Sequence, residues 1–297
     1  MKKMLITGGT VFVSRYMAEY FRDSYDVYVL NRNTKPQSKG VTLIEGDRHD
    51  LGEKLREYHF DVVLDTAYTG DDVNSLLDAL GGFDNYILIS SSAVYPEWAD
   101  QPFTEETAIG PNKIWGVYGT NKIAAEEALL SRVPGAYVLR SPYLYGPMDN
   151  VYREAFVFDC ALEGRKFYLP KDGGMKLQFF HVKDLCRFVA VLLDKQPEQH
   201  VFNVGNAESV TIREWVELCY QAAGKRAEFF NVSAEVEQRC YFPFYNYEYY
   251  LDVQKQSTLM PETVPLAEGL KEAYAWYVEN GDKVYKKPYF AYIEANF

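Results

Sequence analysis

The stretch that decides the fold is Met4-Leu5-Ile6-Thr7-Gly8-Gly9-Thr10-Val11-Phe12-Val13-Ser14, where an apolar run ends in two glycines and helical spacing follows. A strand that turns into a helix through glycines can present backbone N–H groups to a pyrophosphate. A Gly-Gly pair alone also fits an ordinary strand–helix turn. Its place in the first strand–helix unit of the chain favours a dinucleotide site.

Short apolar runs alternate with helix-like segments through the first half of the chain. Strands are expected at 4–7, 26–30, 41–44, 61–65, 86–90 and 136–140, and helices at 13–22, 73–80 and 114–130. Such alternation predicts right-handed βαβ units and a parallel sheet with helices on both faces. The expected fold class is α/β, a doubly wound parallel Rossmann sheet with a smaller, interleaved C-terminal α/β part that binds the substrate.

The alternation weakens after residue 140. Strands are expected at 179–182 and 201–204, and helices at 184–193, 211–223 and 266–278. Thr211 and Glu214 form a plausible capping box at the start of one of these helices. We expect residues 1–165 to form an NAD(P)-binding Rossmann domain to which residues 177–205 return, and residues 166–297 to bind mainly the substrate.

Composition narrows the class of protein. The 297 residues are 47% hydrophobic and 25% charged, as in a globular protein with a full core. A net charge of −11 argues against a nucleic-acid partner. The four cysteines are widely separated, so we expect reduced thiols and neither a metal site nor a disulfide framework. With no long apolar stretch to cross a membrane or to act as a signal peptide, a cytoplasmic location is expected.

Two loops are candidates for the adenosine end of a dinucleotide. An acidic residue that binds the ribose often follows the second strand of such folds. Here Asn31-Arg32 stands in that place, and a guanidinium without a carboxylate slightly favours NADP over NAD. A solvated turn residue is the alternative interpretation of Arg32. Asp47, just after the third strand, is placed to accept a hydrogen bond from the adenine amine.

Tyr118 and Lys122 stand four residues apart on an expected helix and therefore share one face. A free tyrosine has a pKa of about 10, which a nearby ammonium would lower toward the working range. The lysine can also hold the nicotinamide ribose. The pair alone also fits a solvated helix face. Ser90-Ser91-Ser92, at the end of an expected strand, adds a hydroxyl where the strands of a doubly wound sheet open to a ligand.

With these pieces placed, the sequence resembles the short-chain dehydrogenase/reductase superfamily, in its extended, NAD-dependent epimerase/dehydratase branch. The resemblance runs across nearly the whole chain. Its motifs are Thr7-Gly8-Gly9, Ser90-Ser91-Ser92-Ala93-Val94-Tyr95, Tyr118-Gly119-Thr120-Asn121-Lys122, Leu139-Arg140-Ser141-Pro142-Tyr143-Leu144-Tyr145-Gly146-Pro147, Phe180-His181-Val182-Lys183-Asp184 and Phe202-Asn203-Val204-Gly205-Asn206.

The resemblance implies a role for each matching residue. Tyr118 would be the general acid/base, Lys122 its electrostatic partner and Ser91 the active-site serine. Ser92, Tyr143 and Tyr145 would contact the substrate. The cofactor would contact Gly8, Gly9, Thr10, Phe12, Val13, Asn31, Arg32, Asp47, Ala67 and Lys122. Family members usually act on nucleotide-linked sugars, often as homodimers, so a sugar-like substrate and a homodimer are expected.

The chain departs from the family pattern in two places. Val11 and Ser14 stand where the family has glycines, and a β-branched valine narrows the pyrophosphate pocket and disfavours a positive φ. These replacements predict weaker or displaced cofactor binding, and loss of cofactor binding is the alternative. The C-terminal part offers Arg239 for a substrate diphosphate, or as a solvated surface residue. The aromatic run over 241–250 fits stacking on a substrate ring or packing between the two parts.

Two functions follow from these observations. The leading hypothesis is an NAD(P)-dependent epimerase, dehydratase or reductase that acts on a nucleotide-sugar-like substrate through Ser91, Tyr118 and Lys122. Gly46-Asp47-Arg48 and Asn31-Arg32 also resemble an atypical subgroup that includes chloroplast stem-loop-binding proteins. The alternative is therefore a non-catalytic dinucleotide sensor or an RNA-associated protein. The joint presence of the three catalytic candidates and the acidic charge balance favour the enzyme.

Overall fold

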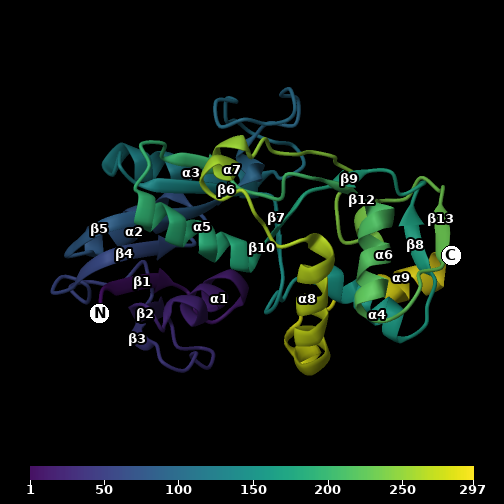
Figure 1. The fold of residues 1–297 in the computed structure, drawn as a ribbon, viewed down its shortest axis with the longest axis horizontal. Coiled ribbons are helices and arrows are strands. Elements are labelled where there is room, and N and C mark those ends of the chain that lie inside the picture. Colours follow the sequence, from purple (N-terminus) through teal and green to yellow (C-terminus); the bar gives the residue numbers. More distant parts are fainter.

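A seven-stranded parallel sheet forms the N-terminal part of the protein, which a computed structural model describes over all of residues 1–297. The strand order is β11-β6-β5-β4-β1-β2-β3 (Figure 1). Its strands are β1 (Lys3–Thr7), β2 (Asp26–Asn31), β3 (Thr42–Glu45), β4 (His59–Asp65), β5 (Gly82–Ser91), β6 (Tyr137–Ser141) and β11 (Val201–Asn203). The expected doubly wound parallel sheet is confirmed.

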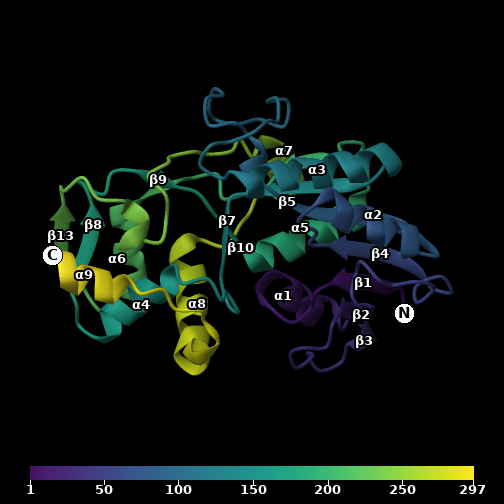
Figure 2. The ribbon, with the colours of Figure 1, turned by 180° about the vertical axis from the view of Figure 1, so that it is seen from behind.

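Helices cover both faces of this sheet (Figures 1 and 2). One face packs on α1 (Phe12–Phe21) and α5 (Val182–Lys195), and the other on α2 (Gly70–Ala79) and α3 (Val117–Arg132). Successive strand residues point to opposite faces. Met4 and Ile6 therefore lie in the core beside α1, whereas Leu5 lies in the core beside α2.

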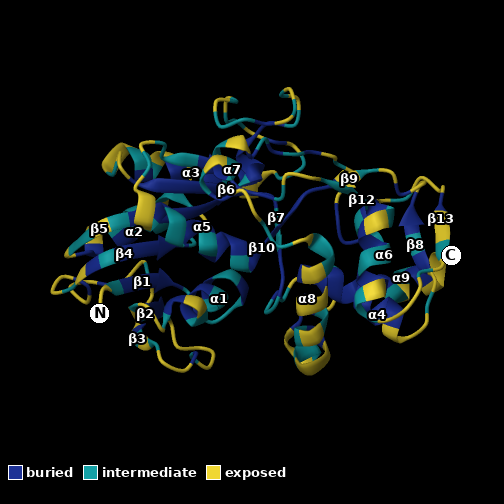
Figure 3. Cartoon of the chain, in the orientation of Figure 1, coloured by how far each residue is buried: buried dark blue, intermediate teal, exposed yellow.

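The C-terminal part has a core of its own, and its buried segments are dark blue in Figure 3. It packs four helices against the parallel pair β8 (Phe167–Pro170) and β13 (Phe229–Val232). The helices are α4 (Glu154–Leu162), α6 (Ile212–Ala222), α8 (Leu266–Asn280) and α9 (Tyr289–Asn296). Thr211 and Glu214 form the expected capping box at the start of α6. None of the chain's helices is long and apolar enough to cross a membrane.

Short elements connect the two parts. β7 (Tyr143–Tyr145) pairs with β10 (Phe179–His181), and β9 (Lys176–Leu177) pairs with β12 (Val210–Thr211). The remaining elements are α7 (Gln254–Leu259), η1 (Ser92–Val94), η2 (Gln238–Cys240) and η3 (Gly281–Lys283). Because β11 returns to the edge of the sheet beside β6, the chain is interleaved between the two parts.

The position of the site follows from the sheet. The last residues of β1, β2, β4, β5 and β6 are Thr7, Asn31, Asp65, Ser91 and Ser141. The carboxyl ends of parallel strands meet at one edge of a sheet, where α/β proteins bind ligands. These five polar side chains therefore come together, although they are far apart in the sequence.

Candidate active site

A cavity of about 530 Å³ lies between the two parts of the molecule. The N-terminal part contributes Ser91, Tyr118 and Lys122 to its wall, and the C-terminal part contributes Arg153 and Tyr245. All three catalytic candidates therefore face one space that is large enough for a small ligand.

Helix α3 brings Tyr118 and Lys122 to the end of β5. The helix packs closely on η1, where a Cβ built on Gly119 would lie 2.5 Å from the Ala93 carbonyl oxygen. Only glycine permits that approach. Tyr118 keeps 36% of its surface exposed, whereas Lys122 keeps 5%. The phenol is thus open to a ligand, and the lysine is enclosed behind it.

Lys122 bridges the ends of two strands. Its Nζ donates to the Ala67 carbonyl at 2.7 Å and to the Ile89 carbonyl at 2.9 Å. It also lies 5.1 Å from the centre of the Tyr68 ring. Burial of the ammonium lowers the pKa of Lys122 to about 8, although Asp65 and Glu126 oppose the shift. An ammonium has three donors, so one N–H of Lys122 is left for a ligand in the cavity.

Tyr118 lies between Ser91 and Tyr68. Desolvation raises the pKa of the Tyr118 phenol, and the nearby Ser91 hydroxyl opposes that rise. The ring meets Tyr68 edge-on, with 5.8 Å between centroids. Lys122 makes no direct hydrogen bond to the phenol, and its two hydrogen bonds go to backbone carbonyls. Ser91 is therefore the polar neighbour that acts directly on Tyr118.

The glycine turn after β1 requires both of its glycines. Gly8 and Gly9 have φ of +89° and +87°, a region that disfavours other residues. A Cβ on Gly8 would lie 2.7 Å from the Ser14 hydroxyl oxygen, and one on Gly9 would lie 2.5 Å from Val29. Val11 has an ordinary extended φ of −138°, so it carries no strain. The strained positive φ falls on Phe12, at +33°.

The start of α1 offers donors for an anion. No side chain caps this helix, and its first turn holds no acidic residue. The first N–H groups of a helix have no partner within the helix and attract phosphates. Phe12, Val13 and Ser14 line the cavity at this point. Ser14 is no obstacle, since its hydroxyl donates to the Val11 carbonyl at 3.1 Å. These donors fit a dinucleotide pyrophosphate.

A second cavity, of about 420 Å³, continues from the first and shares Thr66 and Tyr68 with it. Its wall includes four of the cofactor residues expected from the sequence: Gly8, Asn31, Arg32 and Asp47. Asn31 holds the glycine turn, because its Nδ2 donates to the Gly8 carbonyl at 2.7 Å. The two cavities together form a path from Tyr118 to Arg32, and its ends are named the catalytic end and the adenosine end after the roles expected from the sequence.

Several expected residues lie outside both cavities. Gly9 and Thr10 shape the turn without lining either cavity, and Ala67 reaches the site only through its carbonyl. Ser92 is buried and donates to the Tyr249 hydroxyl at 3.1 Å. Tyr145 is buried beside His181 and packs against Gly269 of α8, whereas Tyr143 does line the cavity.

The C-terminal wall contains two arginines. Arg153 donates to Asp149 at 3.2 Å and lies 5.7 Å from the Tyr143 ring centre. This residue was not expected at the site from the sequence. The spacing of four residues between Asp149 and Arg153 is the feature of the sequence that could have indicated this ion pair. Arg239 makes no ion pair, donates to the Pro243 carbonyl and lies 4.8 Å from the Tyr245 ring centre.

The aromatic run of the C-terminal part divides between the two roles expected for it. Phe244, Tyr245 and Tyr249 line the cavity together with Trp115. Tyr241 and Phe242 lie in the C-terminal core. The same segment therefore contributes both to the cavity wall and to internal packing.

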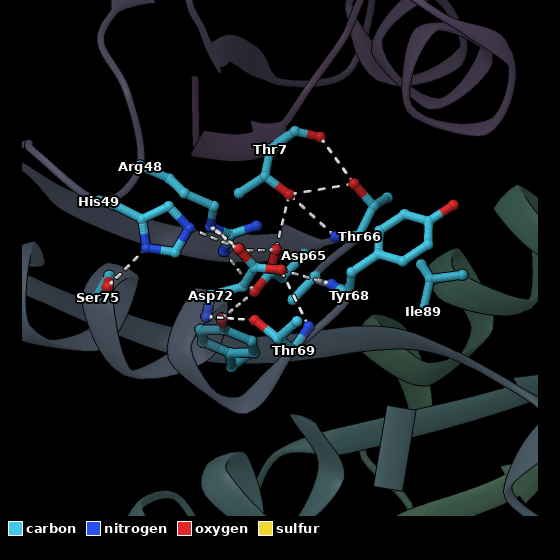
Figure 4. Close-up of polar contacts among 12 residues, drawn as sticks. Thr7, Arg48, His49, Asp65, Thr66, Tyr68, Thr69, Asp72, Ser75 and Ile89 are labelled. Carbon is cyan, nitrogen blue, oxygen red and sulfur yellow. Dashed lines mark hydrogen bonds and ion pairs between the residues drawn. The ribbon is translucent and has the colours of Figure 1, made fainter. Parts of the chain in front are cut away.

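A polar network lies beside the adenosine end (Figure 4). Asp65, which is fully buried, accepts from Thr7 at 2.7 Å, from Tyr86 at 2.6 Å and from Arg48 at 3.1 Å. Arg48 also lies 3.7 Å from Asp72. Neither Asp65 nor its pairing with Arg48 was expected from the sequence. A buried carboxylate at the end of an apolar strand requires such a partner, but the sequence does not say which.

The chain is similar to known proteins in sequence and in structure. The chain is 27% identical to the chloroplast stem-loop binding protein of 41 kDa b of Arabidopsis thaliana, over 92% of this chain and 78% of that protein. It is 24% identical to the UDP-glucose 4-epimerase of Corynebacterium glutamicum, over 75% of this chain and 80% of that enzyme. The structure of UDP-glucuronic acid 4-epimerase from Bacillus cereus, in complex with UDP-glucuronic acid and NAD, superposes with a TM-score of 0.73. That comparison covers 93% of this chain and 99% of the epimerase at 20% identity.

The model of the NAD dependent epimerase/dehydratase family matches residues 73–205. This stretch holds Ser91, Tyr118 and Lys122, and the fold around it is that of the superposed epimerase. The resemblance expected from the sequence is therefore confirmed over residues 73–205, which match the model of this family.

Proposed function

We propose that the protein is an NAD(P)-dependent epimerase, dehydratase or reductase that acts on a nucleotide-sugar-like substrate. The observation that carries this proposal is the convergence of Ser91, Tyr118 and Lys122 on one cavity that continues into the pocket beside Gly8. A proton-transfer group, a hydroxyl and a dinucleotide path are then in reach of one ligand.

Tyr118 exchanges a proton with a hydroxyl or carbonyl oxygen of the substrate. Ser91 donates a hydrogen bond to the same oxygen and holds it in line with the phenol. Lys122, with one N–H free, holds the nicotinamide ribose and adds positive charge where the phenolate forms. A nicotinamide dinucleotide, when bound, supplies the hydride acceptor or donor for the carbon that carries this oxygen.

The opposite wall fits the rest of such a substrate. Trp115 and Tyr245 present aromatic surface to a sugar or a nucleobase. Arg239, which has no acidic partner, is free to bind a phosphate, and Arg153 adds a second guanidinium that Asp149 partly neutralises. UDP-glucuronic acid is the ligand named for the superposed epimerase.

NADP is the proposed cofactor over NAD. Arg32 is exposed at the rim of the adenosine cavity and makes no ion pair, which suits a 2′-phosphate. The superposed epimerase binds NAD, so the two cofactors need direct comparison. A homodimer and a cytoplasmic location, both expected from the sequence, belong to the same proposal.

Two measurements test the proposal. Fluorescence titration with NADH and NADPH should show saturable binding of at least one, and absence of both would refute a dinucleotide enzyme. A panel of UDP-, GDP- and dTDP-linked sugars, followed by product analysis and by the absorbance of the reduced nicotinamide, should then identify a substrate. An isomer as product indicates epimerisation, loss of water indicates dehydration, and net consumption of the reduced cofactor indicates reduction.

A further inference from the structure

We propose that Arg48 is a cofactor-binding residue whose guanidinium face stacks on the adenine ring of the dinucleotide. This inference rests on the proposed function, because it concerns the adenosine end of the same path. Arg48 lines the cavity of about 420 Å³ together with Asp47 and Gly8. It also lines a smaller cavity of about 300 Å³ on the side of His49 and Ser75, so Arg48 borders two cavities although only 18% of its side chain is exposed.

Two carboxylates fix the plane of the guanidinium (Figure 4). Nη2 of Arg48 donates to both Asp65 oxygens at 3.1 Å, and Nε lies 3.7 Å from Asp72. The N–H groups of a guanidinium all lie in its plane. The carboxylates therefore occupy the edge of the group, and no aromatic ring of the chain stacks on its faces.

The charge balance decides what kind of ligand suits Arg48. Its single positive charge faces two carboxylates, Asp65 and Asp72, so the cluster does not attract an anion. His49 lies 3.0 Å from Asp72 and shares that carboxylate. A phosphate is better placed at Arg32, which makes no ion pair. A guanidinium whose charge is balanced by neighbouring carboxylates can still stack on an aromatic ring.

The aromatic ring at this end of the path is the adenine. The nicotinamide end is fixed by Tyr118 and Lys122, which line the other cavity. Asp47, beside Arg48, is the residue expected to bind the adenine amine. A ring held by Asp47 at its edge and by Arg48 at its face would be recognised as a purine.

The two carboxylates that bind Arg48 also bind other residues along the path. Asp65 accepts from Thr7, which precedes the glycine turn, and Asp72 accepts from the backbone N–H groups of Tyr68 and Thr69. Ala67, within that segment, accepts from Lys122. Occupation of the adenine site would therefore steady the segment that positions Lys122.

The test compares ligands with and without adenosine. Arg48→Lys keeps the positive charge for Asp65 and Asp72 but removes the planar face. We expect its Kd for NADH and NADPH to rise about five- to tenfold, with its Kd for reduced nicotinamide mononucleotide within about twofold of wild type. Arg56→Lys is the matched control, because Arg56 lies on the same loop, lines neither cavity and pairs only with Glu53. The control should bind all three ligands as wild type does.

Arg48→Gln combined with Asp65→Asn keeps the test valid if the lysine variant does not fold, since it removes both buried charges together. The double variant should show the same selective loss. Unchanged dinucleotide binding in a folded variant would overturn the inference, and so would an equal loss for the mononucleotide. Failure of the proposed function is a separate result, because it would appear as wild-type protein that binds neither NADH nor NADPH.

Discussion

The two ends of the cofactor path are built in different ways. At the catalytic end, Ser91 ends a strand and Tyr118 and Lys122 lie on a helix, so regular secondary structure sets their positions. At the adenosine end, Arg32 and Asp47 lie on exposed loops that follow β2 and β3. Substitutions at the catalytic end should therefore change rates, whereas those at the adenosine end should change affinities.

The largest effect is expected from Tyr118→Phe. The variant keeps the ring that contacts Tyr68 edge-on and loses only the hydroxyl that moves the proton. Turnover of the substrate found in the panel should fall about 10³-fold, within the range for loss of a general acid/base. Dinucleotide affinity should stay within about twofold of wild type. Comparable loss of turnover and of affinity would show that the catalytic end also determines affinity.

Lys122 should make stability depend on pH. Its pKa is lowered from 10.5 to about 8 by burial, so the folded protein favours the neutral amine. Since the unfolded chain then holds more protons between these values, stability rises as pH increases through about 8 and is lost as pH falls back through it. Lys122→Met has no titrating group at this position, so its stability lacks this pH dependence. Wild type should therefore gain about 2 kcal/mol relative to the variant between about pH 7.5 and 9.5.

Chemical denaturation of both proteins at the two pH values measures that gain. The difference between the two proteins removes the contribution of the many buried tyrosines, which titrate in both. A constant difference would show that Lys122 titrates near its ordinary pKa in the folded state. Turnover of Lys122→Met should also fall about 10²-fold, since the variant has no ammonium to support the phenolate.

The same contrast explains what could be predicted from the sequence. Tyr118 and Lys122 were found because residues four apart on one helix are neighbours, which is a local rule. The pairing of Arg48 with Asp65 spans 17 residues and depends on the strand order of the sheet, which no local pattern encodes. Helix α4 was missed because almost all of it is buried, so its sequence has no polar face. Tyr145 was expected at the substrate, but α8 covers it at Gly269.

Arg32→Ala tests the adenosine end. If the exposed guanidinium binds a 2′-phosphate, the Kd for NADPH should rise about tenfold while the Kd for NADH stays unchanged. Lys35→Ala, on the same exposed loop and away from both cavities, is the matched control. Fluorescence titration of the three proteins gives the answer. Equal weakening of NADH and NADPH would assign Arg32 to the loop's structure and remove the preference for NADP.

The smallest effect is expected from Val11→Gly, where the two ends of the path meet. Val11 lines the cavity beside the unpaired N–H groups of α1, and removal of its branched side chain gives the pyrophosphate more room. Dinucleotide affinity should improve about threefold. The fold should tolerate the change, because Val11 is the N-cap of α1 and glycine suits that position better than valine, which offsets glycine's greater chain entropy. Titration of the variant with NADH and NADPH, beside a thermal melt, measures both quantities. Unchanged affinity with an unchanged melting temperature would mean that the extended backbone at Val11 already directs its side chain away from the cofactor. Valine in place of the family's glycine would then reduce neither the cofactor affinity nor the stability of this chain.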